Sequence, residues 1–104
     1  MLFITYFELN PDLDPSEIAE ITQKLISKGV YPPKGTKILS WYVSTGDYWG
    51  IMVSENESAE AAAIGTNAFR VVKPGIFKCV KSTLAMKAED LIPVAMKIGK
   101  QIKG

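Results

Sequence analysis

The 104-residue chain contains no histidine and a single cysteine, Cys79. Without histidine, it lacks the commonest metal ligand, the usual partner of a catalytic serine or cysteine, and the side chain best suited to proton transfer near neutral pH. One cysteine forms no intrachain disulfide, zinc cluster or iron–sulfur site. No glycine-rich phosphate loop follows an expected strand. We therefore expect neither a metal ion nor an organic cofactor.

Arginine and long apolar runs are also scarce. Arg70 is the only arginine, so a nucleic-acid surface with interleaved arginines and aromatics is not expected. No stretch free of charged residues approaches the roughly 20 apolar residues that cross a bilayer, and the basic C-terminal segment has no Trp or Phe to anchor it on lipid. With no recognisable signal peptide and one cysteine, the expected location is the cytoplasm.

The remaining composition is that of an ordinary folded domain. The 12 basic and 11 acidic residues leave a net charge of +1, and 47% of the residues are apolar. Each expected helix begins with acids and ends with basic residues, as the helix dipole favours, so the charge pattern indicates no polyanionic partner. We expect one domain over residues 1–104, long enough to bury a core without a metal or disulfide.

The apolar spacing and the turn residues divide the chain into seven elements. Asp14-Pro15-Ser16-Glu17 is typical of a capped helix start, and Asn56 or Ser58 is the expected cap of the second helix. Pro93 interrupts the last helix, which then begins at Ala88 or near Asp90. The expected strands are 2–9, 37–45, 48–54 and 76–84, and the expected helices are 15–28, 58–72 and 88–103.

The order βαββαβ plus a terminal helix predicts an α+β, ferredoxin-like fold, in which two helices cover one face of a four-stranded antiparallel sheet. Strict alternation along the second strand places Trp41 and Val43 on one side, and Ile38 and Tyr42 on the other. Both faces are then apolar, and an uncovered face would be a large apolar patch. We expect a homodimer through sheet-on-sheet packing, or cover from the C-terminal helix.

The segment 40–49, SWYVSTGDYW, with the apolar strand 51–53 and the helix start 60–63, resembles uncharacterised GYD-type families of small dimeric α+β-barrel proteins. Gly46, Asp47 and Tyr48 fit the first three positions of their usual pattern, whereas Trp49 stands where those families have Asp. The resemblance implies a dimeric barrel. For some distant relatives it also implies oxygen or isomerisation chemistry without a cofactor.

The first candidate site is the turn that contains Asp47, Tyr48 and Trp49. A carboxylate beside two aromatics at the mouth of a barrel could orient a small planar ligand. The alternative is local: Gly and Asp are common in turns, and aromatics pack across strands. The local interpretation is the commoner outcome.

The second candidate site is formed by Tyr6, Trp41, Tyr42 and Cys79 on neighbouring strands. Alternation places Glu8 on the same face as Tyr6, and a buried Glu8 could act as an acid or base. A Glu at a strand end more often reaches solvent. Cys79 is either a reactive thiolate near lysines or, more often, a small apolar core residue.

Our leading hypothesis is a non-catalytic or weakly catalytic homodimer that binds a small apolar or aromatic molecule between sheet and helices. The expected ligand-binding residues are Tyr6, Trp41, Tyr42, Tyr48, Trp49 and Cys79. A cofactor-independent enzyme is the alternative, with Glu8 or Asp47 moving a proton and Tyr6 or Tyr48 stabilising an oxyanion. A third hypothesis is a protein-interaction module that uses the open sheet face.

Overall fold

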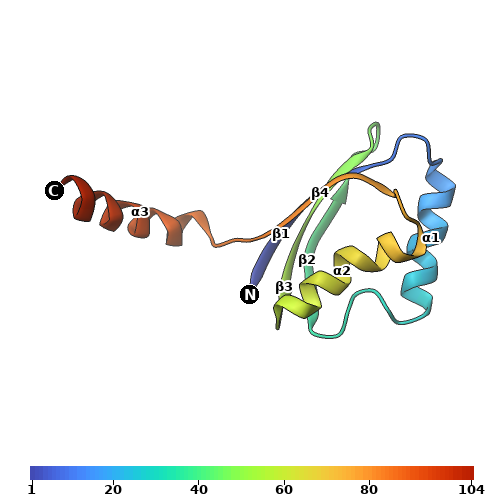
Figure 1. Cartoon of the computed structure of the whole chain (residues 1–104), viewed down its shortest axis with the longest axis horizontal. Coiled ribbons are helices and arrows are strands. Elements are labelled where there is room, and N and C mark those ends of the chain that lie inside the picture. The colour runs from blue at the N-terminus through green and yellow to red at the C-terminus, as the bar shows by residue number, and fades with distance from the viewer.

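A computed structural model describes residues 1–104. The four strands form one antiparallel sheet in the order β2-β3-β1-β4. Helices α1 and α2 cover one face, called the inner face here, and leave the outer face open (Figure 1). This is the ferredoxin-like α+β fold expected from the sequence, followed by a C-terminal helix. The elements are β1 (Leu2–Leu9), α1 (Pro15–Ser27), β2 (Thr36–Val43), β3 (Trp49–Asn56), α2 (Ala59–Val72), β4 (Phe77–Leu84) and α3 (Ala88–Lys103).

The two covering helices begin at side-chain caps. The carboxylate of Asp14 accepts hydrogen bonds from the Glu17 amide at 2.9 Å and from the Ser16 hydroxyl at 2.5 Å. Because both bonds favour the ionised carboxylate, the pKa of Asp14 is lowered, with the Ser16 bond the larger cause. The Ser58 hydroxyl oxygen accepts from the Ala61 amide at 3.1 Å, so Ser58 rather than Asn56 caps α2.

The expectation from strict alternation along β2 is wrong. The pairing of β2 with β3 shifts register between Ile38 and Ser40, and the extra residue turns Ile38 onto the same face as Trp41, where both pack against the core. Tyr42 stays on the outer face and is 68% exposed. The bulge therefore moves Ile38 to the inner face, whereas Leu39, which strict alternation would place beside Trp41, is exposed.

The core lies between the inner face and the two helices. The packing around Gly50 of β3 leaves no room for a side chain, because a Cβ there would overlap the Phe7 ring and the carbonyl oxygen of Tyr42. Phe7 contributes to the core from β1, next to this glycine. The buried apolar cluster consists of Phe7, Leu9, Leu13, Ile21, Leu25, Tyr31, Phe69 and Ile76.

Helix α3 extends away from the rest of the molecule (Figure 1). It begins at Ala88, so a start near Asp90 is wrong, and it contains no buried residue. Pro93 is its sixth residue. Proline has no amide hydrogen to donate to the carbonyl of Glu89, but the helix continues beyond it to Lys103. None of the helices is long and apolar enough to span a bilayer.

Candidate functional site

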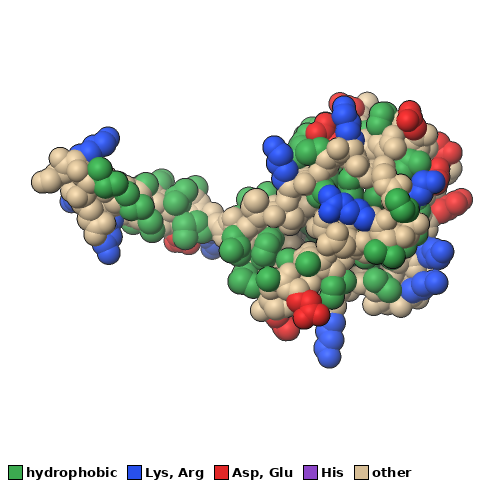
Figure 2. Space-filling model, viewed as in Figure 1, with side chains coloured by type: hydrophobic (Ala, Val, Ile, Leu, Met, Phe, Trp, Pro, Cys, Tyr) green, Lys and Arg blue, Asp and Glu red, His purple; other side chains and the backbone are tan.

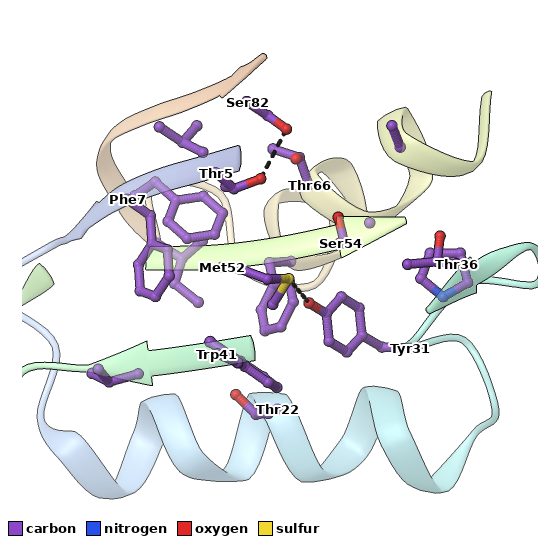
Figure 3. A pocket seen from close by; sticks show the side chains of 18 of the residues that line it. Thr5, Phe7, Thr22, Tyr31, Thr36, Trp41, Met52, Ser54, Thr66 and Ser82 are labelled. Carbon is purple, nitrogen blue, oxygen red and sulfur yellow. Dashed lines mark hydrogen bonds between the residues drawn. The ribbon is translucent and has the colours of Figure 1, made fainter. Parts of the chain in front are cut away.

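A cavity of about 130 Å³ lies between the inner face of the sheet and the helical layer (Figure 3). The sheet contributes Phe7, Trp41 and Met52, while Tyr31 and Phe69 close it from the loop after α1 and from α2. No residue that lines it carries a charge. Such a cavity favours neutral, mostly apolar molecules, because transferring an unpaired charge into it would be costly.

Most polar groups around the cavity are already paired. The Tyr31 hydroxyl donates to the Met52 sulfur at 3.3 Å (Figure 3), and the hydroxyls of Thr5 and Ser82 lie 2.9 Å apart in a hydrogen bond. At the opposite end, a chain of bonds joins three further side chains. Its members are Thr36, Asn56 and Ser54, at donor–acceptor distances of 2.6 and 3.0 Å.

The indole nitrogen Nε1 of Trp41 is the exception. It is buried and has no hydrogen-bond partner, which holds for no other buried side-chain nitrogen or oxygen. An unsatisfied buried donor costs about 1–3 kcal/mol. Since Trp41 lines the cavity, an acceptor atom on a bound molecule could remove this cost.

Tyr31 forms a rigid aromatic wall with two neighbours. Its ring meets Trp41 edge-on, with 5.6 Å between centroids, and Phe69 in the same manner at 5.0 Å. Both arrangements are favourable for aromatic pairs. Burial raises the pKa of Tyr31 to about 12, so at physiological pH its hydroxyl keeps the proton that it donates to the Met52 sulfur.

Of the six residues expected to bind a ligand, only Trp41 lines this cavity. Tyr6 alternates with Thr5 and Phe7, which do line it, and therefore points to the outer face. Tyr42 and Trp49 are exposed on that same face. The expected set is thus divided between the two faces of the sheet.

The outer face does bring several of these residues together. In the sheet register, Glu8 lies opposite Trp49 on one side and Cys79 on the other. The Tyr6 and Trp49 rings are 6.3 Å apart. The pKa of Tyr6 is raised by desolvation first, and then by the negative charges of Glu8, Cys79 and Asp47. Glu8 and Cys79 are half-buried there, and neither belongs to the core cluster.

The turn residues Asp47 and Tyr48 have local partners. The Asp47 carboxylate accepts from the Tyr48 amide at 2.8 Å. The Tyr48 hydroxyl donates to the carbonyl of Leu13 at 2.9 Å, which ties the β2–β3 turn to the loop after β1. These contacts favour the structural interpretation of the turn, because both groups already have a partner.

Sequence reasoning missed most of the cavity wall. Tyr31 lies in the Val30-Tyr31-Pro32-Pro33 connection, which reads as a loop, yet it belongs to the buried core. Ser54 and Asn56 are buried polar residues at the end of β3. The sequence did contain a signal for them. Ser54 and Asn56 alternate with the charged Glu55, so both uncharged side chains are expected on the face of the strand opposite to Glu55.

Comparison with known proteins supports the fold. No protein-family model and no curated protein matches the chain. Among solved structures, it is similar to a protein from Nitrosomonas europaea named "Putative antibiotic biosynthesis monooxygenase", with a TM-score of 0.55 and 14% identity over 84% of this chain and 97% of that one. It is also similar to Rv0793 from Mycobacterium tuberculosis, with a TM-score of 0.51 and 14% identity over 83% and 94%. Neither name refers to the GYD-type group.

Proposed function

We propose that this protein is a homodimeric α+β barrel that binds a small, neutral aromatic molecule in the cavity between the sheet and the helices. The unpartnered indole N–H of Trp41, in a cavity lined by no charged residue, is the observation that carries the proposal. A ligand with a carbonyl, ether or hydroxyl oxygen would satisfy this donor. The aromatic walls favour a flat ligand.

The cavity volume limits the size of the ligand. A cavity of about 130 Å³ is close to engineered apolar cavities of about 150 Å³ that admit benzene. A single ring close to benzene in size is therefore about the largest ligand that fits without rearrangement. A larger ligand requires movement, which the unbranched Met52 side chain allows more readily than the aromatic walls do.

The homodimer part of the proposal is supported by the outer face. Ile4, Trp49 and Ile51 are each more than one-third exposed on this face, and Tyr42 more so. A second copy that packs its own outer face here would cover this apolar surface. The protein-interaction alternative uses the same face and predicts a monomer.

The enzyme alternative is less well supported by the arrangement of the side chains. Neither Glu8 nor Asp47 lines the cavity, so no carboxylate is in place to move a proton from a molecule bound there. Acid–base chemistry through Glu8 and Tyr6 would need a substrate on the outer face instead. The likeness to the monooxygenase-named protein, at 14% identity, supports the fold and not its reaction.

The two tryptophans provide the test, because Trp41 lines the cavity and Trp49 lies on the outer face. We would titrate ¹⁵N-labelled protein with phenol, acetophenone and benzene while recording the two indole N–H signals. We expect phenol and acetophenone to move the Trp41 signal downfield, as a new hydrogen bond does, and benzene to bind without that downfield shift. The Trp49 signal should stay in place.

A pair of variants on α2 controls for non-specific binding. Ala62 lines the cavity, whereas its neighbour Ala63 is exposed and does not. We expect Ala62→Leu to fill the cavity and weaken binding of phenol at least about tenfold, and Ala63→Leu to leave it unchanged. Equal effects of the two variants, or a response of Trp49 alone, would contradict binding in this cavity.

A further inference from the structure

Helix α3 is an amphipathic helix without a partner. Apart from the half-buried Gly99, every one of its residues is exposed. Figure 2 shows apolar side chains along its length. By helical spacing Leu91, Val94, Ile98 and Ile102 share one face, away from Lys97 and Lys100, whereas Ile92 and Met96 lie outside that face. The large exposed apolar residues on α3 are Leu91, Ile92, Val94, Met96, Ile98 and Ile102.

A helix of this kind needs a surface to be stable. Isolated helices shorter than about 12–15 residues are marginal in water, and most helical stability in proteins comes from packing an apolar face. At 16 residues, with Pro93 inside and no side-chain cap at Lys87, α3 is barely longer than that limit. Its apolar face therefore requires a partner surface.

The connection to β4 directs α3 away from its own chain. The Ala85 amide donates to the Leu2 carbonyl at 2.9 Å, which prolongs the sheet ladder. Lys87 is extended, with φ −61° and ψ 141°. The connecting residues Ala85, Met86 and Lys87 include none that favour a tight turn, and the chain leaves the sheet without turning back on it (Figure 1).

The area needed for a stable dimer makes a second copy the fitting partner. Four strands of eight residues give the outer face a projected area of about 500 Å². This is small beside the roughly 800 Å² of accessible surface that each partner of a standard interface buries. A 16-residue helix adds about 240 Å². If two copies exchange these helices, the projected area on each copy rises to about 1,000 Å², since each copy both gives and receives one.

We propose that α3 is an exchanged arm, which crosses to a second copy of this chain and packs its apolar face against it. Leu84 and Met86, at the end of β4 and in the connection to α3, are also exposed, so the apolar surface of the arm begins before α3 itself. This inference rests on the proposed homodimer. It does not depend on ligand binding in the cavity.

An anionic lipid surface is the competing partner, and the residues favour it less. The apolar face of α3 has no Trp or Phe, and the helix carries Glu89 and Asp90 as well as three lysines. The test therefore includes vesicles as an outcome.

The experiment mixes ¹⁴N- and ¹⁵N-labelled full-length protein in equal amounts, cross-links lysines and reads the isotopes in each linked peptide pair. Lys97 and Lys103 report from α3. On the body, Lys81 reports contact with the outer face and Lys24 reports contact with α1. With exchanged arms, about half of the pairs between α3 and the body carry both isotopes. Sedimentation of the same mixture gives the oligomeric state.

Two variants on α3 separate its faces. Ile98→Glu places a charge on the apolar face and Lys100→Glu places the same charge on the polar face. Neither position contributes to the core, so both proteins should fold. We expect Ile98→Glu to reduce mixed-isotope pairs at least about tenfold, because burying the new carboxylate is costly, and Lys100→Glu to preserve them.

Each other outcome overturns the exchange. A dimer whose α3 links carry one isotope only shows that the helix folds back on its own chain, and a dimer without α3 links shows a free helix. In both cases the proposed homodimer survives. A monomer overturns the homodimer as well. If α3 gains protection from hydrogen exchange only with phosphatidylserine vesicles, and Lys100→Glu weakens that protection, the partner is a membrane.

Discussion

The two faces of the sheet are built from the same kinds of residues but have different surroundings. The inner face meets α1 and α2, and its polar groups are paired except for Trp41 Nε1. The outer face carries Tyr6, Tyr42 and Trp49 without cover from its own chain. The difference shows that apolar composition alone does not make a core. A core also needs a second layer, and only one face receives it within this chain.

Truncating one large aromatic on each face should give the largest contrast. We expect Phe7→Ala to lower the free energy of unfolding by about 3–5 kcal/mol, because it leaves a cavity in the core. Tyr42→Ala, on the outer face, should change it by less than about 0.5 kcal/mol in dilute protein. Urea unfolding measures both. Similar losses would show that the outer face is covered even in the dilute chain.

The contact between Gly50 and Phe7 gives the next effect. A methyl group at Gly50 would overlap the Phe7 ring and the Tyr42 backbone, so Gly50→Ala should cost about 1–3 kcal/mol. Gly46, in the β2–β3 turn, has no atom within 4 Å of an added Cβ and no positive φ. Gly46→Ala is therefore the matched control, with no loss expected in the same unfolding measurement.

The buried hydroxyl of Tyr31 predicts a dependence of stability on alkaline pH. Its pKa of about 12 in the fold exceeds the usual 10.0, so the Tyr31 hydroxyl ionises at a lower pH in the unfolded chain than in the folded one. The contribution of the neutral hydroxyl to the free energy of unfolding is complete below pH 10. It is lost as pH rises toward 12, at up to about 1.4 kcal/mol per pH unit. Unfolding experiments between pH 9 and 12 should show this slope, and Tyr31→Phe should flatten it. An equal slope in the variant would contradict the assignment.

The smallest effect concerns the cap of α1. The lowered pKa of Asp14 means that the fold favours its ionised form, so its contribution to stability is present above pH 3.8 and is lost as pH falls through the lowered pKa. Asp14→Asn keeps the capping oxygen but loses the charge. The variant should be less stable than the natural chain at pH 7, and the gap should close at pH 2. A gap independent of pH would contradict this.

Much of the fold was predictable because its signals are local. The run Leu2–Leu9 and the caps at Asp14 and Ser58 act over a few residues, and the structure places these elements where the sequence indicated. The site was less predictable. Trp41 was among the expected residues, but Tyr31 was not, because its burial depends on packing against Trp41 and Phe69, which are distant in sequence.

The sequence by itself determined the order of the elements, the helix caps and the lack of histidine-based or multi-cysteine chemistry, since these depend on residue type and short spacing. Only the tertiary structure decided which side of the sheet the helices cover, and with it that Trp41 rather than Tyr6 faces the cavity. A one-residue bulge near Ile38 moves that side chain to the other face of the sheet without any change in composition. The separation of α3 from the body is equally invisible in its spacing, because an amphipathic pattern predicts a partner surface without identifying it.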